Sequence, residues 1–502
     1  MLIVWIFLYF GGFNLFLQSM FFFVSVIILY RFRKTCSFFQ EYKQQWNLLK
    51  KYEKYLLGFA FVLVLILSVS FSFLPDSETY YIQTVKWGNL RGFVPGLMNI
   101  HPFLGQFSGW HILQSGVNIP FLGFRANALN GFLFLLFLYW VVFDKKNFFS
   151  FWLKFLVFFV LIGIFVAGTP SPDFPVWLLS LLIFERFIKI YHRFQTNQFK
   201  SFVLLVFFSL MIKITAVVNL FLLLTLWIKY FQKIKKNTSF ILFTGFLSLI
   251  LILSKNFILT GYLFYPFDFL SKFFIPFWQY PTQLLHHLSE LSKIESSTIN
   301  FNENFTQAFN RWFFSGNLIE HIVHPLMVLA LLSFPMLLYY KRKNICCFTT
   351  YVFIYVFGLV YFLVILFINP NSRFFLHILL FMLFVGIEIL FSKTYIHKIY
   401  ITGLVTLLIS LMISIFFISF GKWQLLIPQQ SHLGNTYQTQ IKGNLKYHYP
   451  KGKDFFWETG DAPIPSFTPA MSGYFEEKFG YFTQSTQDER AYYSHPKKDD
   501  NL

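Results

Sequence analysis

Apolar runs of about 20 residues recur along the whole chain, and each is long enough to cross the hydrocarbon core of a bilayer. Of the 502 residues, 56% are hydrophobic and only 13% are charged. A soluble protein of this length needs much more polar surface. The pattern therefore predicts an integral membrane protein whose helices are largely covered by lipid.

These runs predict an all-α polytopic membrane protein with about twelve transmembrane helices. The expected helices cover residues 2–30, 55–74, 121–143, 151–168, 176–190, 202–212, 216–232, 239–259, 325–340, 345–368, 374–392 and 399–420. The first run lacks the basic segment and the small-residue cleavage site of a signal peptide, so we expect it to be retained. Residues 1–54 are then an N-terminal helix with a basic linker, 55–420 a transmembrane core and 421–502 a C-terminal region.

Basic residues are concentrated in alternate connections between these runs. Six connections hold 23 of the 41 Lys and Arg residues but only four of the 22 acidic residues. By the positive-inside rule these connections face the cytoplasm. The large loops 75–120 and 260–324, the C-terminal region and both termini are then expected on the outer side. This distribution accounts for the net charge of +19, so we expect membrane lipid and no nucleic acid as a partner.

The first outer loop begins with two acidic residues at the expected edge of the membrane. Asp76 and Glu78 could accept a proton from an incoming hydroxyl group, or hold a divalent metal ion near a phosphate. Acidic residues also flank membrane helices simply because lipid excludes them, so both interpretations stay open. Polar and aromatic side chains that could contact a substrate follow in the same loop: Tyr81, Lys86, Trp87, Arg91 and His101.

Three more polar residues occur at short breaks between apolar runs. Asp173 ends the turn 169–173 and could be a second carboxylate of the same site, although Asp also favours such turns. Lys213 interrupts an apolar hairpin, where an ammonium group normally faces protein or water. Arg373 follows a short outer turn, where a guanidinium group could bind phosphate oxygens in a bidentate manner. Lys213 could equally be a snorkelling lysine, and Arg373 an interfacial anchor.

This arrangement resembles the C-type (GT-C) fold of membrane glycosyltransferases, and most closely a poorly characterised bacterial branch of them. Asp76 with Glu78 occupies the position of that family's early acidic residue. Lys213 and the pair Arg373–Phe374 resemble its basic residues at a central helix and a late outer turn. The segment 261–266, which contains Tyr265, resembles the start of its later outer loop, and the segment 460–465 resembles part of its outer tail.

The resemblance implies a membrane enzyme that moves a sugar from a polyprenyl-phosphate carrier to a glycan, lipid or protein acceptor. The reaction would take place at the outer face of a bacterial inner membrane, with both termini in the periplasm. Asp76 or Glu78 would act as the base, and Lys213 and Arg373 would hold the carrier phosphate. A divalent metal ion is possible in that family but is not implied by these residues alone.

Two other functions stay open. A polymerase or ligase of lipid-linked glycans shares this topology and could use Arg311 with His321 or His324. A polysaccharide exporter or flippase needs polar residues along many membrane helices, and the expected helices of this chain have few. The lipid-linked intermediate that accumulates when the protein is absent would separate these functions.

Overall fold

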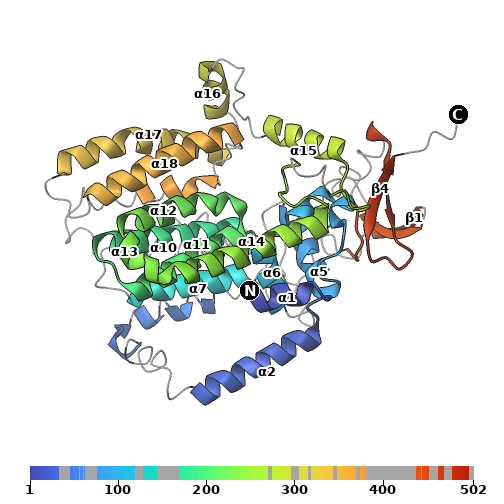
Figure 1. Ribbon diagram of the computed structural model, residues 1–502, viewed down its shortest axis with the longest axis horizontal. Coiled ribbons are helices and arrows are strands. Elements are labelled where there is room, and N and C mark those ends of the chain that lie inside the picture. Colours follow the sequence, from blue (N-terminus) through green and yellow to red (C-terminus); the bar gives the residue numbers. More distant parts are fainter. Residues whose placement is uncertain are drawn as a thin grey trace.

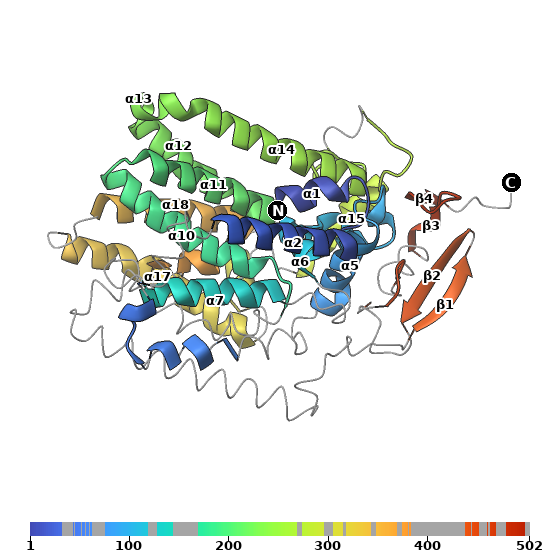
Figure 2. The same ribbon diagram turned by 90° about the horizontal axis from the view of Figure 1, so that it is seen from below.

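The chain is mostly helical, and its long helices lie side by side along one direction (Figures 1 and 2). This computed structural model describes residues 1–32, 44, 46–51, 53–55, 57–59, 61–62, 76–118, 128–143, 169–268, 274–295, 305–314, 318–342, 348–368, 374–379, 381–382, 437–442, 444–450, 459, 462–467 and 478–496. The long helices are α7 (Ala128–Phe143), α10 (Asp173–His192), α11 (Thr196–Ile212), α12 (Leu220–Lys229), α14 (Thr238–Thr260), α17 (Leu318–Lys341) and α18 (Phe348–Ile368). We refer to them together as the bundle.

Helix α10 forms the centre of the bundle. Fifteen of its twenty residues are buried, including Glu185, which is 1% exposed and pairs with Lys189 one turn later. Phe184 packs edge-on against Phe357 of α18 and against Phe381. A helix that is apolar on all sides is stable only where other elements cover it. The helix expected at 176–190 is therefore present, but it begins earlier, at Asp173, and continues to His192.

Residues 76–118 form a compact layer at one end of the bundle, at the right of Figure 1, which we name the loop layer. Its elements are η1 (Ser77–Tyr81), a π-helix, followed by α5 (Ile82–Leu90), the 3₁₀ turns η2 (Leu97–Asn99) and η3 (Pro102–Gln106), and α6 (Gly109–Val117). Most of its residues are buried. Helix α1 (Leu2–Leu8) packs on α6, and α15 (Thr282–Glu295) lies above this end in Figure 1.

The remaining helical elements connect or flank the bundle. They are α2 (Leu15–Phe32), η5 (Ile214–Asn219), α13 (Phe231–Ile234), η6 (Lys235–Asn237) and α16 (Phe305–Phe313). The first apolar run of the sequence is divided between α1 and α2, since the chain turns at residues 9–14. Gly12 lies there against Asn89 and Leu90, where a Cβ atom would meet the Asn89 carbonyl oxygen at 2.4 Å.

Two antiparallel hairpins lie beyond the loop layer. Strands β1 (Tyr437–Lys442) and β2 (Leu445–Pro450) pair in register from Tyr437 opposite Pro450 to Lys442 opposite Leu445. Strands β3 (Tyr481–Ser485) and β4 (Tyr492–Pro496) pair from Tyr481 opposite Pro496 to Ser485 opposite Tyr492. The sequence predicts an all-α protein, and these strands show that this prediction is wrong.

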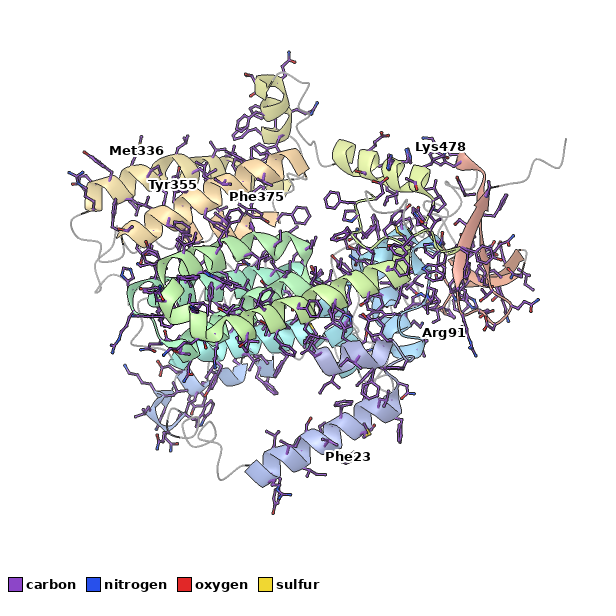
Figure 3. All side chains as sticks on the ribbon, viewed as in Figure 1. Phe23, Arg91, Met336, Tyr355, Phe375 and Lys478 are labelled. Atoms are coloured by element: carbon purple, nitrogen blue, oxygen red, sulfur yellow. The ribbon has the colours of Figure 1, made fainter. Side chains whose placement is uncertain are left out.

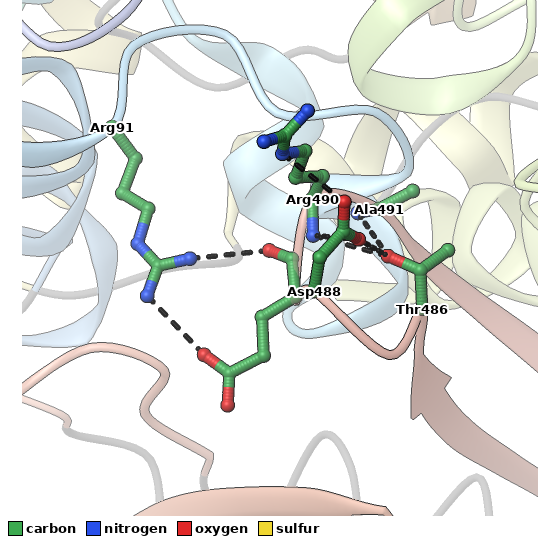
Figure 4. Close-up of polar contacts among 6 residues, drawn as sticks. Arg91, Thr486, Asp488, Arg490 and Ala491 are labelled. Carbon is green, nitrogen blue, oxygen red and sulfur yellow. Dashed lines mark hydrogen bonds and ion pairs between the residues drawn. The ribbon is translucent and has the colours of Figure 1, made fainter.

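The second hairpin is bonded to the loop layer through backbone and side-chain groups. The amide of Tyr492 donates to the Pro95 carbonyl at 3.0 Å, and Asn99 Nδ2 donates to the Tyr492 carbonyl at 3.1 Å. Arg91 donates both to the carboxylate of Glu489, at 3.2 Å, and to its carbonyl, at 3.1 Å (Figure 4). Trp87 packs edge-on against the Tyr492 ring. The β3–β4 hairpin is thereby held against the segment that follows Asp76.

The expectation of about twelve transmembrane helices is wrong. Among the described residues, one continuous helical run, Phe231–Thr260, is long and apolar enough to cross a membrane. Five shorter apolar helices cover Leu15–Arg31, Thr196–Ile212, Ile214–Lys229, His324–Tyr340 and Phe348–Val364. The expected helices at 151–168 and 399–420 lie outside the described residues, as does most of 374–392.

The prediction failed because apolar composition does not distinguish burial in protein from burial in lipid. Helix α10 is apolar because it fills the centre of the bundle, as its burial shows. Helix α11 ends at Ile212 and the chain becomes extended at Lys213, so the apolar run on that side covers only 202–212. Apolar runs of about 10–14 residues are more typical of core helices than of membrane helices.

Candidate functional site

Asp173 is placed by a hydrogen-bonded turn at the start of α10. The amide of Asp173 donates to Ser171 Oγ, and the amide of Ser171 donates to Thr169 Oγ1, both at 3.3 Å. Asn130 of α7 donates through Nδ2 to the carbonyls of Thr169, at 2.6 Å, and Ser171, at 3.0 Å. Trp110 Nε1 in turn donates to Asn130 Oδ1 at 2.6 Å. Because all these groups are buried, the turn has little freedom to move.

Lys213 forms an ion pair with Asp173. The two residues are 40 positions apart, and they meet because α10 begins where α11 ends. A carboxylate in the first turn of a helix is also stabilised by the helix dipole. The Lys213 ammonium group lies 4.2 Å from the centre of the Phe374 ring, in cation–π geometry. The Phe374 carbonyl accepts a hydrogen bond from Tyr361 at 2.9 Å, which fixes its position.

Asp76 and Tyr81 are brought together by the π-helix η1. In a π-helix residues five apart lie above one another, and here the Ile82 amide donates to the Ser77 carbonyl. The same spacing places the Tyr81 hydroxyl 3.4 Å from Asp76 Oδ2, to which it donates. Single π-turns of this kind are frequent at functional sites, where they bring side chains into line.

His111 of α6 connects these two pairs. Its ring lies 4.8 Å from the Tyr81 ring, centre to centre. Burial lowers the pKa of His111 to about 3; the Pro170 backbone and the Asp173 carboxylate oppose this shift, and Lys255 adds to it. The imidazole is therefore neutral at pH 7. We name the group formed by Asp76, Tyr81, His111, Asp173 and Lys213 the polar junction.

Aromatic rings extend from the polar junction into the loop layer. Tyr80 contacts Tyr81 and Phe103, with ring centres 4.5 and 5.0 Å apart. Phe103 also contacts His101, and both Phe103 and Tyr265 pack against a buried cluster that contains Met98 and Tyr262. Of the predicted substrate-binding residues, His101 thus joins the junction through other aromatic side chains, and Tyr265 lies on the same cluster as Phe103. Burial lowers the pKa of His101 to about 3 and raises that of Tyr265 to about 12.

Three other predicted site residues contact the C-terminal segments. Lys86 Nζ donates to the Ala462 carbonyl at 3.1 Å, and Trp87 and Arg91 contact the β3–β4 hairpin as described above. Gln83 donates to the same Ala462 carbonyl at 2.8 Å, and Thr459 donates to the Thr79 carbonyl at 2.8 Å. These contacts hold η1 and α5 in place, so the C-terminal segments help to fix the position of Asp76, which directly precedes η1.

The remaining predicted residues are only partly described. The side chain of Glu78 and the whole of Arg373 lie outside the described residues, although Phe374, next to Arg373, belongs to the Lys213 contact. Arg311 on α16 is exposed, whereas His324 is buried with its ring 4.3 Å from that of Trp312. The side chain of His321 is not described. No three His, Cys, Asp or Glu side chains within the described part of the chain are grouped as metal ligands.

Sequence reasoning missed Asn130, Trp110 and Lys255, and gave His111 no role. Asn130 is a single polar residue in the apolar run 128–143, which is an unfavourable place for an amide unless a partner is present. Lys255 is likewise the one charged residue in the run 239–259. Both exceptions were visible in the sequence, but their partners lie far away along the chain.

Acidification is expected to destabilise the protein through His101 and His111. Their pKa values of about 3 in the folded protein lie below the ordinary value of 6.5. Between pH 3 and pH 6.5 the unfolded chain therefore binds more protons than the folded protein. Their contribution to stability is complete above pH 6.5 and falls as the pH drops towards 3, by up to about 1.4 kcal/mol per pH unit for each histidine. Thermal unfolding from pH 7 to 4 measures this slope.

Matched variants identify the source of that slope. His111→Gln is expected to make the pH dependence shallower, because one of the buried imidazoles whose pKa is lowered is gone. His286→Gln changes an exposed histidine and is expected to leave the slope unchanged. An identical slope in wild type and His111→Gln would show that His111 does not contribute to the loss of stability at low pH.

The comparisons with known proteins give one match. The model of a protein family described as "Domain of unknown function (DUF8201)" matches residues 1–380. No curated protein and no solved structure matches the chain. The matched region contains every member of the polar junction, and the β hairpins lie beyond it.

Proposed function

This chain belongs to the DUF8201 family, whose description names no activity, and we propose from its polar junction that it is a membrane glycosyltransferase. It would move a sugar from a polyprenyl-phosphate carrier to an acceptor hydroxyl group. The observation that supports this most is the convergence of two carboxylates, a lysine and a neutral histidine at one end of an apolar bundle. Ionisable groups that converge at a buried or half-buried place in this way are typical of functional sites.

The transfer needs a base for the acceptor and positive charge for the leaving phosphate. Asp76 is the base in this proposal: the hydroxyl proton passes to its carboxylate while the hydroxyl oxygen forms a bond to the anomeric carbon. The bond from that carbon to the phosphate oxygen breaks, and its electron pair stays on the carrier phosphate. Tyr81, which donates to Asp76 Oδ2, orients the carboxylate. Lys213, together with Arg373 next to Phe374, adds positive charge on the phosphate side.

The outer surface of the bundle supports a location in lipid. Phe23 of α2 is 64% exposed and Met336 of α17 is 74% exposed, and both lie at the periphery of the molecule (Figure 3). Further large apolar side chains are exposed along neighbouring helices: Phe221, Leu224 and Ile228 of α12, Leu242, Phe243 and Phe246 of α14, and Val356 and Val360 of α18. Soluble proteins rarely expose apolar surface over so many helices.

The two ends of the bundle differ in charge. Lys200, Lys229 and Lys233 lie at the end where α10 finishes, each beside an aromatic ring. Asp173 begins α10, so the polar junction lies about 30 Å from that end at ~1.5 Å per residue. The positive-inside rule then favours a basic end at the cytoplasm and a polar junction at the outer face, which in a bacterium is the periplasmic side of the inner membrane.

The experiment for this function replaces the base. In cells that lack the native gene, Asp76→Asn is expected to reduce transfer by about 100-fold or more, because a positioned base contributes 10²–10⁴-fold. The measurements are the composition of surface glycans and the lipid-linked sugars that accumulate. The matched control is Asp268→Asn, which changes a half-buried acid paired with the exposed His286.

Unchanged glycans and carrier-linked sugars in Asp76→Asn cells with normal protein levels would contradict the proposal. Accumulation of finished lipid-linked oligosaccharides, in place of single carrier-linked sugars, would indicate a polymerase or ligase. Loss of transfer in the Asp268→Asn control would mean that the effect is not specific to the polar junction.

A further inference from the structure

Lys255 is a buried cation that the proposed reaction does not yet use. It lies in the last turns of α14, is 7% exposed, and donates from Nζ to the Phe107 carbonyl at 2.9 Å. In the described residues no carboxylate pairs with it, whereas Lys213 pairs with Asp173 and Lys189 with Glu185. Within the described part of the chain, Lys255 is therefore a buried lysine with a backbone carbonyl, and no carboxylate, as its hydrogen-bond acceptor.

A buried ammonium group is unfavourable unless charge or several acceptors compensate it. The group has three N–H donors, and the Phe107 carbonyl accepts from one of them. The loss of hydration of an ion is much larger than the gain from one neutral hydrogen bond. A hydrophobic side chain of the same length would be cheaper at this position, so the positive charge itself needs an explanation.

The surroundings of Lys255 favour a negatively charged group. Phe107 directly precedes Ser108, the N-terminal cap of α6, and the first amides of a helix attract anions. Gly109, the next residue, is packed so tightly on α11 that a Cβ atom would lie 2.3 Å from the Met211 carbonyl oxygen. The end of α14, the start of α6 and the end of α11 therefore meet at one place.

The electrostatics of His111 support the same conclusion. His111 lies in the first turn of α6, and both Lys255 and Asp173 are close enough to affect its protonation. The imidazole is neutral, and Asp173 is already paired with Lys213. An anion beside Lys255 would thus find the remaining N–H donors of the ammonium group and a helix N-terminus. The Asp173 carboxylate, which would repel the anion, is already paired with Lys213.

We propose that Lys255 and the first turn of α6 bind a phosphate group. The assignment of that phosphate to the polyprenyl carrier rests on the proposed function; the phosphate site itself does not. The phosphate oxygens accept from the Lys255 ammonium group and from the α6 amides, and Lys213 contributes at longer range. In the transfer reaction Lys255 is then the direct cation of the leaving group, and Lys213 mainly holds Asp173.

The test compares binding to the purified full-length chain in detergent, with undecaprenyl phosphate and inorganic phosphate as separate probes. Lys255→Met is expected to weaken binding of the favoured probe by at least about tenfold, as loss of a charged hydrogen bond does. The control is Lys229→Met, since Lys229 also donates to a backbone carbonyl, that of Tyr191, but at the other end of the bundle. Its affinity is expected to stay within about twofold of wild type.

Thermal unfolding without any probe distinguishes a binding role from a structural one. If the charge is uncompensated, Lys255→Met melts at the wild-type temperature or above it. If Lys255 serves only to join α14 to Phe107, the variant melts lower and binds the probes as wild type does, and this result overturns the proposal. An equal loss of binding in Lys229→Met, which indicates general attraction by positive charge, also overturns it.

The two probes separate this site from the proposed function. If both probes bind equally well in a way that depends on Lys255, and no glycosyl transfer is found, the phosphate site is supported and the glycosyltransferase function is contradicted. If transfer depends on Asp76 but not on Lys255, and Lys255→Met binds both probes as wild type does, the glycosyltransferase function is supported and the phosphate site is contradicted.

Discussion

Lys213→Met is expected to lower the free energy of unfolding by about 3 kcal/mol or more. The substitution leaves the Asp173 carboxylate, 7% exposed, without its cation at the junction of α10 and α11. Removing one partner of a buried pair costs more than the pair contributes, because the remaining charge loses the compensation of that partner in the interior. The contact between the ammonium group and the Phe374 ring is lost as well.

The double variant Asp173→Asn/Lys213→Met tests the physical reason. With both charges removed, most of the lost stability is expected to return, because no buried ion remains without a partner. Unfolding is followed by intrinsic fluorescence during denaturation of the detergent-solubilised protein. Arg91→Met serves as the control, since it breaks an exposed pair with Glu489 and is expected to cost less than about 1 kcal/mol.

Additive effects would contradict this account. If the double variant is as unstable as the sum of the two single variants, Lys213 and Asp173 stabilise the fold separately and their pairing contributes nothing. The polar junction would then lose its central contact, and the positioning of the α10 turn would depend on Asn130 and Trp110 alone.

Gly96→Ala is expected to release the β3–β4 hairpin from the loop layer. Gly96 has a φ angle of 71°, and an added Cβ atom would lie 1.9 Å from the Tyr492 carbonyl oxygen. The left-handed conformation costs a residue with a side chain about 1–2 kcal/mol, and the clash adds to this. The neighbouring bonds from Tyr492 to Pro95 and from Asn99 to Tyr492 cannot form once the strand moves away.

The effect should be local, so the measurement has to be local. Hydrogen exchange and limited proteolysis are expected to show residues 478–496 becoming accessible in Gly96→Ala while the bundle stays protected. Gly58→Ala is the matched control, because an added Cβ atom there meets nothing within 4 Å. Unchanged protection of the hairpin in Gly96→Ala would mean that it is not held by the close contact at Tyr492.

The sequence was a good guide to which residues are exceptional and a poor guide to how many helices cross a membrane. Asp76, Asp173 and Lys213 stood out as charges at breaks between apolar runs, and the structure brings Asp173 and Lys213 together. Arg373 and the side chain of Glu78 lie outside the described residues. Lys86, Trp87 and Arg91 came from the same reasoning, yet they contact the C-terminal segments.

The errors have a common physical origin. Hydropathy sums the apolar character of a segment, but whether protein or lipid covers it depends on the neighbours that the fold supplies. For this reason the sequence predicts a membrane helix at 176–190, whereas α10 is the core helix of the bundle. Strands β1 to β4 are short and polar on one side, and their stability depends on docking to the loop layer.

The sequence by itself determined the apolar composition, the concentration of basic residues in alternate connections, and the helix break at Lys213. These are local properties, since each depends on a residue and its neighbours in the chain. Only the tertiary structure decided that Lys213 pairs with Asp173, that Tyr81 and His111 join Asp76 to that pair, and that Lys255 has no acidic partner among the described residues. Such pairings depend on which helix ends lie next to one another in the fold. The free energy of a buried charge depends on the charged and polar groups that this arrangement places beside it.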